Sequence, residues 1–262
     1  MKQVLMCHPK YFNVKYDINP WMTSNINTVD NELAIQQWNT LYAYLKSCSF
    51  VNKVEPVEDC PDMVFTANAG FYFNPCNIIL SNFKHIQRKQ EEIVFQDWFL
   101  KNHYVVHKVS HFFEGQGDLL MDTDNVCYLG TGFRTDIKVQ PEIENILQSY
   151  VHVLKLVDPR WYHLDTCFCP LPNGELLWYP NAFDETSQQL VRDIFSVTID
   201  VSESDALQFA CNSVCVLNNI FSPVISSKLS DKLKSLGYNH ISVDLSEFLK
   251  SGGAARCLVM NL

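Results

Sequence analysis

The 262-residue sequence lacks any long hydrophobic run, and its apolar stretches stay far below the roughly 18 residues that span a bilayer. The N-terminus has no signal-peptide core, because its apolar stretch is short and Pro9 ends it. A prenylation box is also absent, since Cys257 lies too far from the last residue. We therefore expect a soluble protein of the cytosol.

Positive charge is scarce as well: 20 Lys and Arg residues against 29 Asp and Glu residues leave a net charge of −9. This sign argues against a nucleic-acid partner and suits a small cationic substrate. With 47% hydrophobic and 19% charged residues, the chain is not disordered. No linker or Pro/Gly-rich stretch divides it, so we expect one domain over residues 1–262. The oligomeric state stays open.

The ten cysteines lack a zinc-ligand pattern. Cys167 and Cys169 form one close pair and Cys211 and Cys215 another, but neither has zinc-ligand spacing together with a second suitable pair. Free thiols are the rule in the reducing cytosol, and Cys167 and Cys169 are spaced to share the buried face of a strand. We expect no metal and no cofactor.

Four hairpin-like units recur, each with a turn of Asn, Asp, Pro or Gly between short apolar runs. They cover 63–80, 118–129, 166–179 and 213–224. Their turns start at Asn74, Asp122, Pro172 and Asn218, with spacings of 48, 50 and 46 residues. Helical patterns follow at 84–100, 141–148, 184–195 and 226–236, and further strands at 104–109, 152–155, 197–201 and 240–243. The pattern predicts a repeated ββαβ unit.

A fifth unit is divided between the two ends of the chain. The expected strand 254–260 has nothing after it, whereas the chain opens with a strand at 3–7, a helix at 32–46 capped by Asp30, and a strand at 52–57. Pairing the two terminal strands would close a ring and remove exposed sheet edges. The sequence thus predicts an α/β fold, a five-bladed α/β propeller with pseudo-fivefold symmetry. The alternative is an open α/β sheet with coincidental spacing.

Polar residues occupy matching places in these units. In chain order they are Asp62, Glu114 with Asp118, His163 with Asp165, Asn212 and Cys257. In a closed ring these positions would converge on the central axis. Each residue alone has a structural explanation, as a core cysteine, a hydrogen-bonded histidine or a loop carboxylate. The prediction of a site depends on their equivalent placement.

The set suits nucleophilic attack by a thiol on a cation, because several carboxylates can bind a planar guanidinium through charge-assisted hydrogen bonds. A cysteine protease would instead need donors for an oxyanion. A Mg²⁺ or Mn²⁺ site would use the carboxylates but leave Cys257 without a role.

The sequence resembles the guanidino-group-modifying enzymes, also called the pentein or amidinotransferase superfamily. The shared motifs are the segments 62–65, 113–118 and 163–165 and the Gly-rich run into Cys257, in family order over nearly the whole chain. The resemblance implies a five-bladed α/β propeller. It also implies that Cys257 attacks the guanidinium carbon, that His163 is the general acid/base, and that Glu114 and Asp165 hold the guanidinium. The further substrate-binding candidates are Asp62, Phe65, Asp118 and Arg134, the last for the substrate α-carboxylate or, alternatively, as a surface partner of Asp136.

One position departs from the commoner family pattern: Asn68 stands where deiminases usually have an aspartate. A neutral amide should hold a cation less tightly, and a ureido group more readily, than a carboxylate. The segments 65–70 and 17–22 resemble the arginine dihydrolase branch, with Asn19 as a second substrate-contacting amide or simply a turn residue. The resemblance implies hydrolysis of arginine to ornithine. The alternatives are arginine deiminase, dimethylarginine dimethylaminohydrolase, an amidinotransferase, or a non-catalytic binding propeller.

Overall fold

The computed structural model describes residues 2–262 and arranges their strands in five three-stranded sheets. In every sheet a central strand pairs antiparallel with one neighbour and parallel with the other. The sheets are β15 (Met260–Asn261), β1 (Gln3–Cys7) and β2 (Phe50–Val54); β3 (Gly70–Phe73), β4 (Asn77–Leu80) and β5 (Val105–His107); β6 (Leu119–Met121), β7 (Cys127–Thr131) and β8 (Val151–Lys155); β9 (Phe168–Pro170), β10 (Leu176–Trp178) and β11 (Thr198–Asp200); and β12 (Val214–Val216), β13 (Asn219–Ser222) and β14 (Asn239–Ser242).

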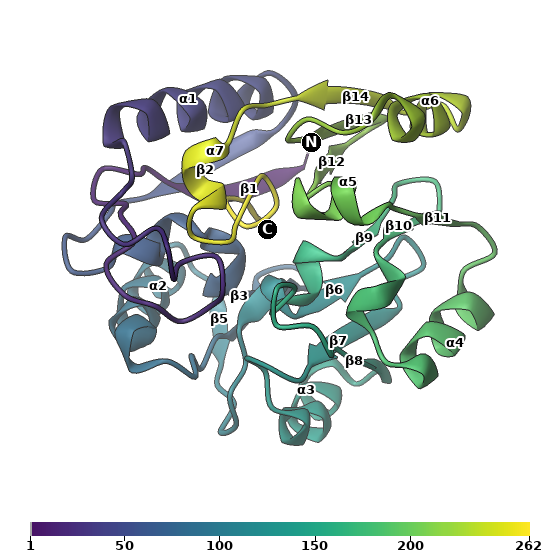
Figure 1. Cartoon of the computed structure of the whole chain (residues 1–262). Helices are drawn as coiled ribbons and strands as arrows, with labels where there is room; N and C mark the ends of the chain where they lie inside the picture. The colour runs from purple at the N-terminus through teal and green to yellow at the C-terminus, as the bar shows by residue number, and fades with distance from the viewer. Residues whose placement is uncertain (1) are drawn as a thin grey trace.

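A helix connects the two parallel strands of each sheet. These helices are α1 (Asn31–Cys48), α2 (Lys89–Lys101), α3 (Gln140–Leu147), α4 (Glu185–Ile194) and α6 (Ser227–Ser235). Figure 1 shows all five on the outside of the molecule, with the sheets toward its centre. Two short helices, α5 (Glu203–Leu207) and α7 (Ser246–Leu249), precede β12 and β15 and were not predicted. The mixed α/β fold with five repeated units is therefore as the sequence indicated.

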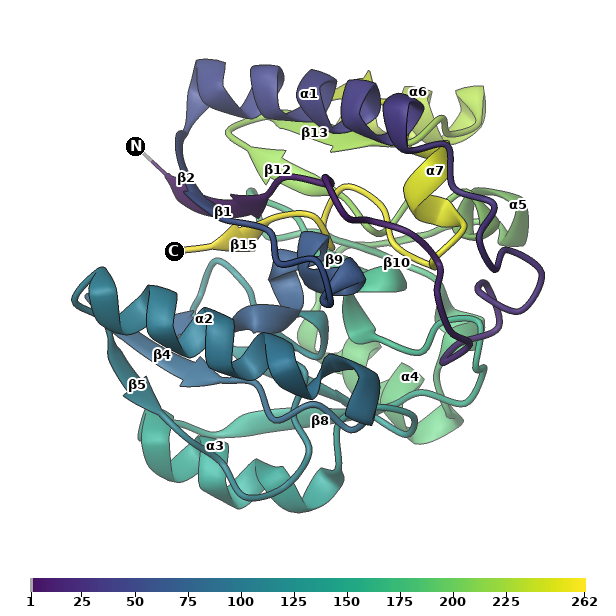
Figure 2. The same ribbon diagram turned by 90° about the vertical axis from the view of Figure 1, so that its left-hand side faces the viewer.

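The terminal strands pair as expected, but the last strand is much shorter than predicted. β1 pairs antiparallel with β15, with Val4 opposite Asn261 and Leu5 opposite Met260, and Figure 2 shows the two strands side by side. The predicted strand 254–260 is wrong over most of its length. Residues before Met260 form a tight turn instead, because the Leu258 N–H donates to the Ala254 carbonyl oxygen at 3.3 Å.

The first predicted hairpin also begins later than expected. Residues Pro61–Val64 and Thr66–Ala69 form two 3₁₀ turns, and the strand starts only at Gly70. Thr66 explains part of this difference, since its hydroxyl donates to the carbonyl oxygen of Leu5 at 2.8 Å and fixes the segment against β1. The apolar residues before Gly70 are therefore buried in turns and do not belong to a strand.

Helix α1 shows how local signals and packing agree. Asp30 caps it, accepting a hydrogen bond from the Leu33 N–H at 3.1 Å. Its buried face carries Ala34, Trp38, Leu41 and Leu45, at the three- and four-residue spacing of one helix side. Burial of a leucine side chain such as Leu41 or Leu45 stabilises the folded state by about 1.5–3 kcal/mol.

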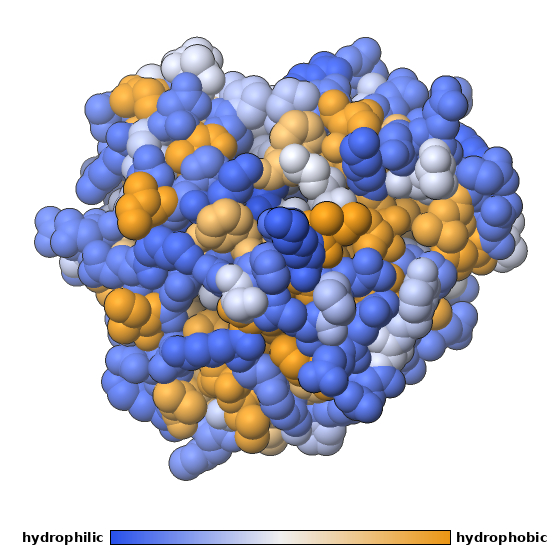
Figure 3. Space-filling view, turned by 90° about the horizontal axis from the view of Figure 1, so that it is seen from below, coloured by the Kyte–Doolittle hydropathy of each residue, from blue (hydrophilic) through white to orange (hydrophobic). Residues whose placement is uncertain are grey.

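The state of the cysteines and the polarity of the surface can be compared with the expectations from the sequence. All ten cysteines are free, and Cys167 and Cys169 both lie in one hydrophobic core cluster, but only Cys169 belongs to a strand, because β9 begins at Phe168. The face in Figure 3 is largely hydrophilic, with separate hydrophobic patches. Of the helices among residues 2–262, none combines the length and apolarity of a bilayer-crossing segment.

Candidate active site

Tight turns before the inner strands carry most of the predicted polar residues. A 3₁₀ turn after Glu114 leads toward β6, and another after His163 leads toward β9. Two glycines permit the first turn. Gly115 has a φ of +59°, and a Cβ on Gly117 would lie only 2.2 Å from Asn68 Nδ2. Larger residues would push these segments apart, so the glycines let side chains from different sheets approach closely.

Cys257 lies in the turn before β15 and is held by Asn212. The Cys257 N–H donates to Asn212 Oδ1 at 3.2 Å, and Asn212 Nδ2 lies 3.1 Å from Cys257 Sγ. The thiol donates to Asp165 Oδ2 at 3.4 Å. Asn212 Nδ2 also donates to the Asp165 carbonyl oxygen at 3.0 Å. One amide thus positions both the thiol and the carboxylate that faces it.

Burial controls the protonation of this group. It raises the pKa of the Cys257 thiol well above its usual range, and the adjacent Asp165 adds to the effect. Burial also raises the pKa of Asp165 to about 7, although Arg256 and the hydrogen bonds from Cys257 and Asn212 oppose it. Asp165 Oδ1 has no hydrogen-bond partner among the described residues. Leaving a buried acceptor unpaired costs about 1–3 kcal/mol, which a cationic donor would offset.

Glu114 connects His163 with Arg134. His163 Nε2 lies 2.7 Å from Glu114 Oε2, and the same oxygen accepts from Arg134 Nη1 at 2.9 Å. Arg134 also donates from Nη2 to the Ile18 carbonyl oxygen at 3.0 Å and stacks over the Tyr162 ring at 4.6 Å. It does not pair with Asp136, which instead caps the turn at Ile137–Val139. The alternative of a surface arginine is therefore wrong.

The pKa values of Glu114 and His163 are both lowered, which favours a charged glutamate and a neutral histidine. Burial disfavours the charged form of Glu114, but Arg134 and His163 outweigh it and hold the pKa of Glu114 below its usual range. Burial lowers the pKa of His163 to about 4, although Glu114 opposes the shift. Near neutral pH the imidazole is uncharged and donates from Nε2 to the Glu114 carboxylate, which leaves Nδ1 to accept a proton.

Asp118 supports this group from a greater distance. Its Oδ2 lies 4.0 Å from His163 Nε2 and accepts from the Thr135 hydroxyl at 2.7 Å, while Oδ1 accepts from the Leu164 N–H at 3.1 Å. Burial raises the pKa of Asp118 well above its usual range. Both oxygens of Asp118 are thus used to connect neighbouring segments of the protein.

A small cavity adjoins Cys257. It is lined by Ile18, Asn19, Met22, Asp62, Phe65, Asn68, Arg88, Arg134, Tyr162, Ser251 and Cys257. Its volume of about 10 Å³ leaves room for roughly one water molecule. The segment with Asn19 covers it: Asn19 Nδ2 donates to the Ser251 carbonyl oxygen at 3.1 Å, and Trp21 Nε1 donates to the Arg160 carbonyl oxygen at 2.7 Å. This segment must move before a larger ligand can enter.

Asn68 has partners on both sides of its amide. Its Oδ1 accepts from Arg88 Nη1 at 2.9 Å, and its Nδ2 donates to the Glu114 carbonyl oxygen at 3.3 Å. Arg88 forms two further bonds to Glu91, at 2.9 and 2.7 Å, and is buried together with it. The Asp62 carboxylate accepts from the Tyr16 hydroxyl at 2.9 Å, and burial raises its pKa.

The structure thus brings the predicted residues together in two layers. Asn19, Asp62, Phe65, Asn68, Arg134 and Cys257 line the cavity, whereas Glu114, Asp118, His163 and Asp165 lie behind its lining. Arg88 and Tyr162 also line it but were missed. No motif marked Arg88, because it falls inside the predicted helix 84–100. Within residues 2–262, no three His, Cys, Asp or Glu side chains gather as a metal site would require.

The protein has five small sheets, a buried thiol that contacts a partly unpaired carboxylate, and a neutral histidine held by a glutamate. These features place it among the guanidino-group-modifying enzymes of the pentein class. The chain belongs to the family described as N,N dimethylarginine dimethylhydrolase, eukaryotic, whose model matches residues 8–262.

Two relatives and one crystal structure illustrate this membership. The chain is 43% identical over 265 residues to the bifunctional arginine dihydrolase/ornithine cyclodeaminase ArgZ of Synechocystis sp., covering 99% of this chain but 37% of ArgZ. It is 36% identical over 262 residues to the N(G),N(G)-dimethylarginine dimethylaminohydrolase of Mycobacterium tuberculosis, covering 100% and 86% of the two chains. The substrate-bound N-terminal domain of ArgZ, a cyanobacterial arginine dihydrolase, matches with a TM-score of 0.98, 42% identity and coverage of 100% and 98%. The chain therefore spans just over a third of the bifunctional relative's length.

Proposed function

We propose that this chain hydrolyses free arginine as an arginine dihydrolase, giving ornithine, carbon dioxide and two ammonia molecules. The observation that carries the proposal is the Cys257 thiol bonded to Asp165, whose second oxygen is unpaired, beside a cavity lined by the amide of Asn68. The similarity to the N-terminal domain of ArgZ over the whole chain supports the same activity.

Binding follows from the charges around the cavity. The substrate guanidinium would donate to Asp165 Oδ1, and its positive charge would lower the pKa of Asp165, so that the carboxyl group releases its proton to solvent. Arg134 also lines the cavity, and its guanidinium would hold the α-carboxylate of arginine. A bound cation next to Cys257 favours its thiolate, which burial alone disfavours.

In the first cycle the thiolate attacks the guanidinium carbon and forms a C–S bond. His163, neutral and oriented by Glu114, transfers the thiol proton to the departing nitrogen, and ammonia leaves. A water molecule, deprotonated by His163, then attacks the thiouronium carbon. The C–S bond breaks, the thiolate is regenerated and citrulline is formed.

In the second cycle the thiolate attacks the ureido carbon of retained citrulline. A second ammonia leaves, and a thiocarbamate joins Cys257 to the side-chain nitrogen of the substrate. Water releases the carbamate, which decays to ornithine and carbon dioxide. Asn68 can take part in both cycles, because its amide carries a donor and an acceptor and adds no charge against the urea oxygen.

A second candidate activity is hydrolysis of arginine or dimethylarginine with release of citrulline. The family match and the Mycobacterium tuberculosis relative favour it. Amidinotransfer lacks support, because no feature of the sequence suggests a site for an acceptor amine. A non-catalytic binding protein would not require the contacts between Cys257 and Asp165 or between His163 and Glu114.

Two aspects of the architecture belong to the same proposal. The pairing of β1 with β15 supports a closed five-bladed propeller with pseudo-fivefold symmetry, in which each unit supplies part of the site. The family match over residues 8–262 supports one enzyme domain that spans residues 1–262.

The test is incubation with arginine, citrulline, agmatine and dimethylarginine in separate reactions, with products identified by mass. We expect ornithine from arginine and from citrulline. Wild-type protein that stops at citrulline, or that prefers dimethylarginine, would replace the dihydrolase with the second candidate. Cys257→Ser should lower turnover by about 10³-fold or more. The matched control is Cys76→Ser, at an exposed thiol, which should retain activity.

Asn68→Asp decides between one cycle and two. A carboxylate would keep Arg88 as a partner, but it would face the Glu114 carbonyl and the urea oxygen of citrulline, acceptor against acceptor. Such a mismatch costs about 1–3 kcal/mol and would expel citrulline, so the product should shift from ornithine toward citrulline. Asn145→Asp adds the same charge at an exposed site and should leave the ratio unchanged. An unchanged ratio in Asn68→Asp contradicts the role assigned to this amide.

A further inference from the structure

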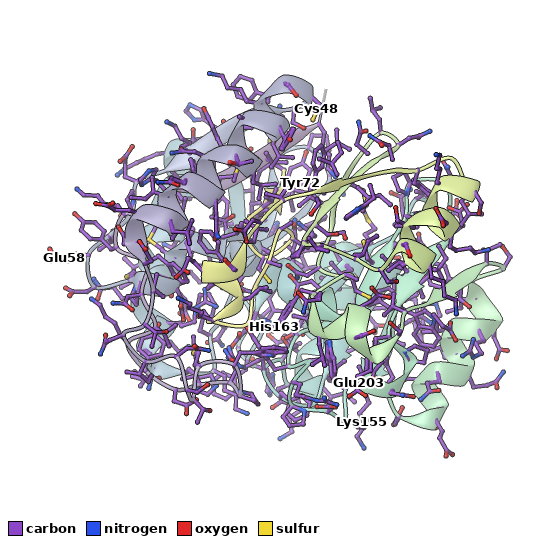
Figure 4. The ribbon with its side chains drawn as sticks, turned by 45° about the horizontal axis from the view of Figure 1, so that its top comes forward. Cys48, Glu58, Tyr72, Lys155, His163 and Glu203 are labelled. Carbon is purple, nitrogen blue, oxygen red and sulfur yellow. The ribbon has the colours of Figure 1, made fainter. Side chains whose placement is uncertain are left out.

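A second, much larger cavity lies among the inner strands, and it shares no lining residue with the cavity beside Cys257. Its volume is about 980 Å³. Residues of β3, β6, β9, β12 and β15 line it, including Tyr72, Leu120, Cys169, Cys215 and Asn261. In Figure 4, Tyr72 and Cys48, which line this cavity, lie apart from His163, which marks the candidate active site.

Two thiols from adjacent units face each other in this cavity. Cys169 belongs to β9 and Cys215 to β12, both residues line the cavity, and their thiols are close enough for each to shift the pKa of the other. Cys169 Sγ also lies 3.9 Å from the carbonyl oxygen of Ser213, two residues before Cys215. Cys215 is partly exposed, whereas Cys169 is 6% exposed. Cys215 is therefore the more exposed residue of the two.

Cations surround the Cys215 thiol. Lys2 and Arg256 line the same cavity, and Lys2 Nζ donates to the Cys215 carbonyl oxygen at 3.0 Å. Among residues 2–262, neither cation forms an ion pair with a carboxylate. The hydrogen bond from Cys169, and then Lys2 and Arg256, lower the pKa of Cys215, although burial opposes them. Reactive cysteines are found in such electropositive, accessible surroundings.

The two other cysteines that line the cavity, Cys48 and Cys211, lack these features. Cys211 is 1% exposed, and burial raises the pKa of its thiol. The Cys48 thiol donates to the Tyr44 carbonyl oxygen of its own helix at 3.3 Å. Of the four cysteines, Cys215 is therefore the one expected to react first, with Cys169 as its partner.

We propose that Cys215 and Cys169 form a redox-active thiol pair that a hydroperoxide entering this cavity oxidises to a disulfide. The Cys215 thiolate attacks one peroxide oxygen, the O–O bond breaks, and a sulfenic acid forms as the remaining oxygen leaves as water or an alcohol. The Cys169 thiol then attacks the Cys215 sulfur and releases water. With hydrogen peroxide, two thiols and one peroxide give one disulfide and two waters.

The disulfide would join the segments that position the nucleophile. Cys169 follows Asp165 by four residues, and Cys215 follows Asn212 by three. Asp165 and Asn212 are the two side chains that contact the Cys257 thiol. The thiol pair is therefore a modification site on β9 and β12, the two strands that directly follow Asp165 and Asn212.

The test treats the full chain with about one equivalent of hydrogen peroxide, blocks the remaining thiols with iodoacetamide, and maps disulfides in an unreduced digest by mass. We expect a peptide that joins Cys169 to Cys215, with the loss of two hydrogens, which dithiothreitol reverses. In Cys169→Ser, Cys215 should stop at the sulfenic acid and react with dimedone.

Cys76→Ser is the matched control, because it removes an exposed thiol outside the cavity and should leave the disulfide unchanged. Oxidation of Cys76 or Cys48 while Cys215 stays reduced would overturn the proposal. A disulfide between Cys169 and any cysteine other than Cys215 would overturn it as well. The disulfide map of the wild-type protein tests the proposal even if Cys169→Ser folds poorly. The result does not depend on whether the protein hydrolyses arginine.

Discussion

The two carboxylates of the candidate site, Glu114 and Asp165, are equally buried but differently paired. Glu114 contacts Arg134 and His163, and these partners hold its pKa below the usual range against the effect of burial. Asp165 forms no ion pair among residues 2–262, and burial raises its pKa to about 7. One oxygen of Asp165 also lacks a hydrogen bond.

This difference divides the site into a permanent and a conditional anion. Glu114 stays ionised whether or not a ligand is bound, so it orients His163 at all times. Asp165 is only partly ionised near neutral pH and becomes a stable anion when a cation arrives. The Cys257 thiol lies next to the conditional anion, and its activation is thereby coupled to binding.

Removing the permanent anion should have the largest effect. Glu114→Gln leaves His163 without a charged partner and Arg134 without a counter-ion, so kcat for arginine should fall by about 10²–10⁴-fold. Glu142→Gln is the matched control, since it removes a histidine–glutamate pair with His111 at the surface. Steady-state ammonia release measures both. Equal turnover in Glu114→Gln and Glu142→Gln would contradict the role of Glu114 as the permanent anion of the site.

Removing the conditional anion should affect binding more than turnover. Asp165→Asn takes away a charge-assisted bond to the guanidinium, worth about 1.5–3 kcal/mol, so KM for arginine should rise about 10- to 100-fold. Part of kcat should be retained, because the amide still accepts from Cys257. A larger loss in kcat than in KM would assign Asp165 to the chemical step instead.

Arg134 tests the partner of the permanent anion. Arg134→Lys keeps the charge but loses the planar guanidinium that contacts Glu114 and Ile18 together. We expect KM for arginine to rise about tenfold with a smaller change in kcat. Arg160→Lys is the control, because Arg160 stacks on Trp161 and pairs with Asp158 at the surface. Comparable KM values in the two variants would contradict a substrate role for Arg134.

The pH profile should show the smallest effect. Because the pKa of Asp165 in the free protein is about 7, its carboxylate is lost as pH falls through that value. The value of kcat/KM should therefore rise by a few-fold per unit between about pH 6 and pH 8, as expected for one titrating group. His163, with a pKa of about 4, contributes nothing in this range. Asp165→Asn should flatten the profile, and persistence of the slope would point to another group.

The fold could be predicted because its signals are local and repeated. The signals are turn residues, apolar runs of strand length and the helix cap at Asp30, and all of them act over a few residues. The turns and the apolar runs also recur at a similar spacing along the chain. The 3₁₀ turns before β3 and the short β15 could not be predicted in the same way. Their backbones are fixed by distant partners such as Leu5 for Thr66 and Asn212 for Cys257.

The site could be predicted only in part. Its polar residues stand at equivalent points of the repeats, so their convergence followed from the ring. Their pairing did not follow, because contact between Arg134 and Glu114 or between Arg88 and Asn68 depends on side-chain directions in the packed molecule. The cover over the cavity was also missed, since Asn19 is fixed by Ser251 across the chain.

The wide separation of the site residues along the chain has a consequence for folding. Cys257 and Asp165 are 92 residues apart, Cys257 and Asn212 are 45 apart, and His163 and Glu114 are 49 apart. Contacts across such separations form slowly, because loop-closure entropy must be overcome before they stabilise anything. No fragment made of one or two sheets contains all of these residues. The Cys257 thiol therefore meets Asp165 and Asn212 only after the segments that carry them have come together, and we expect no activity from a partly folded chain.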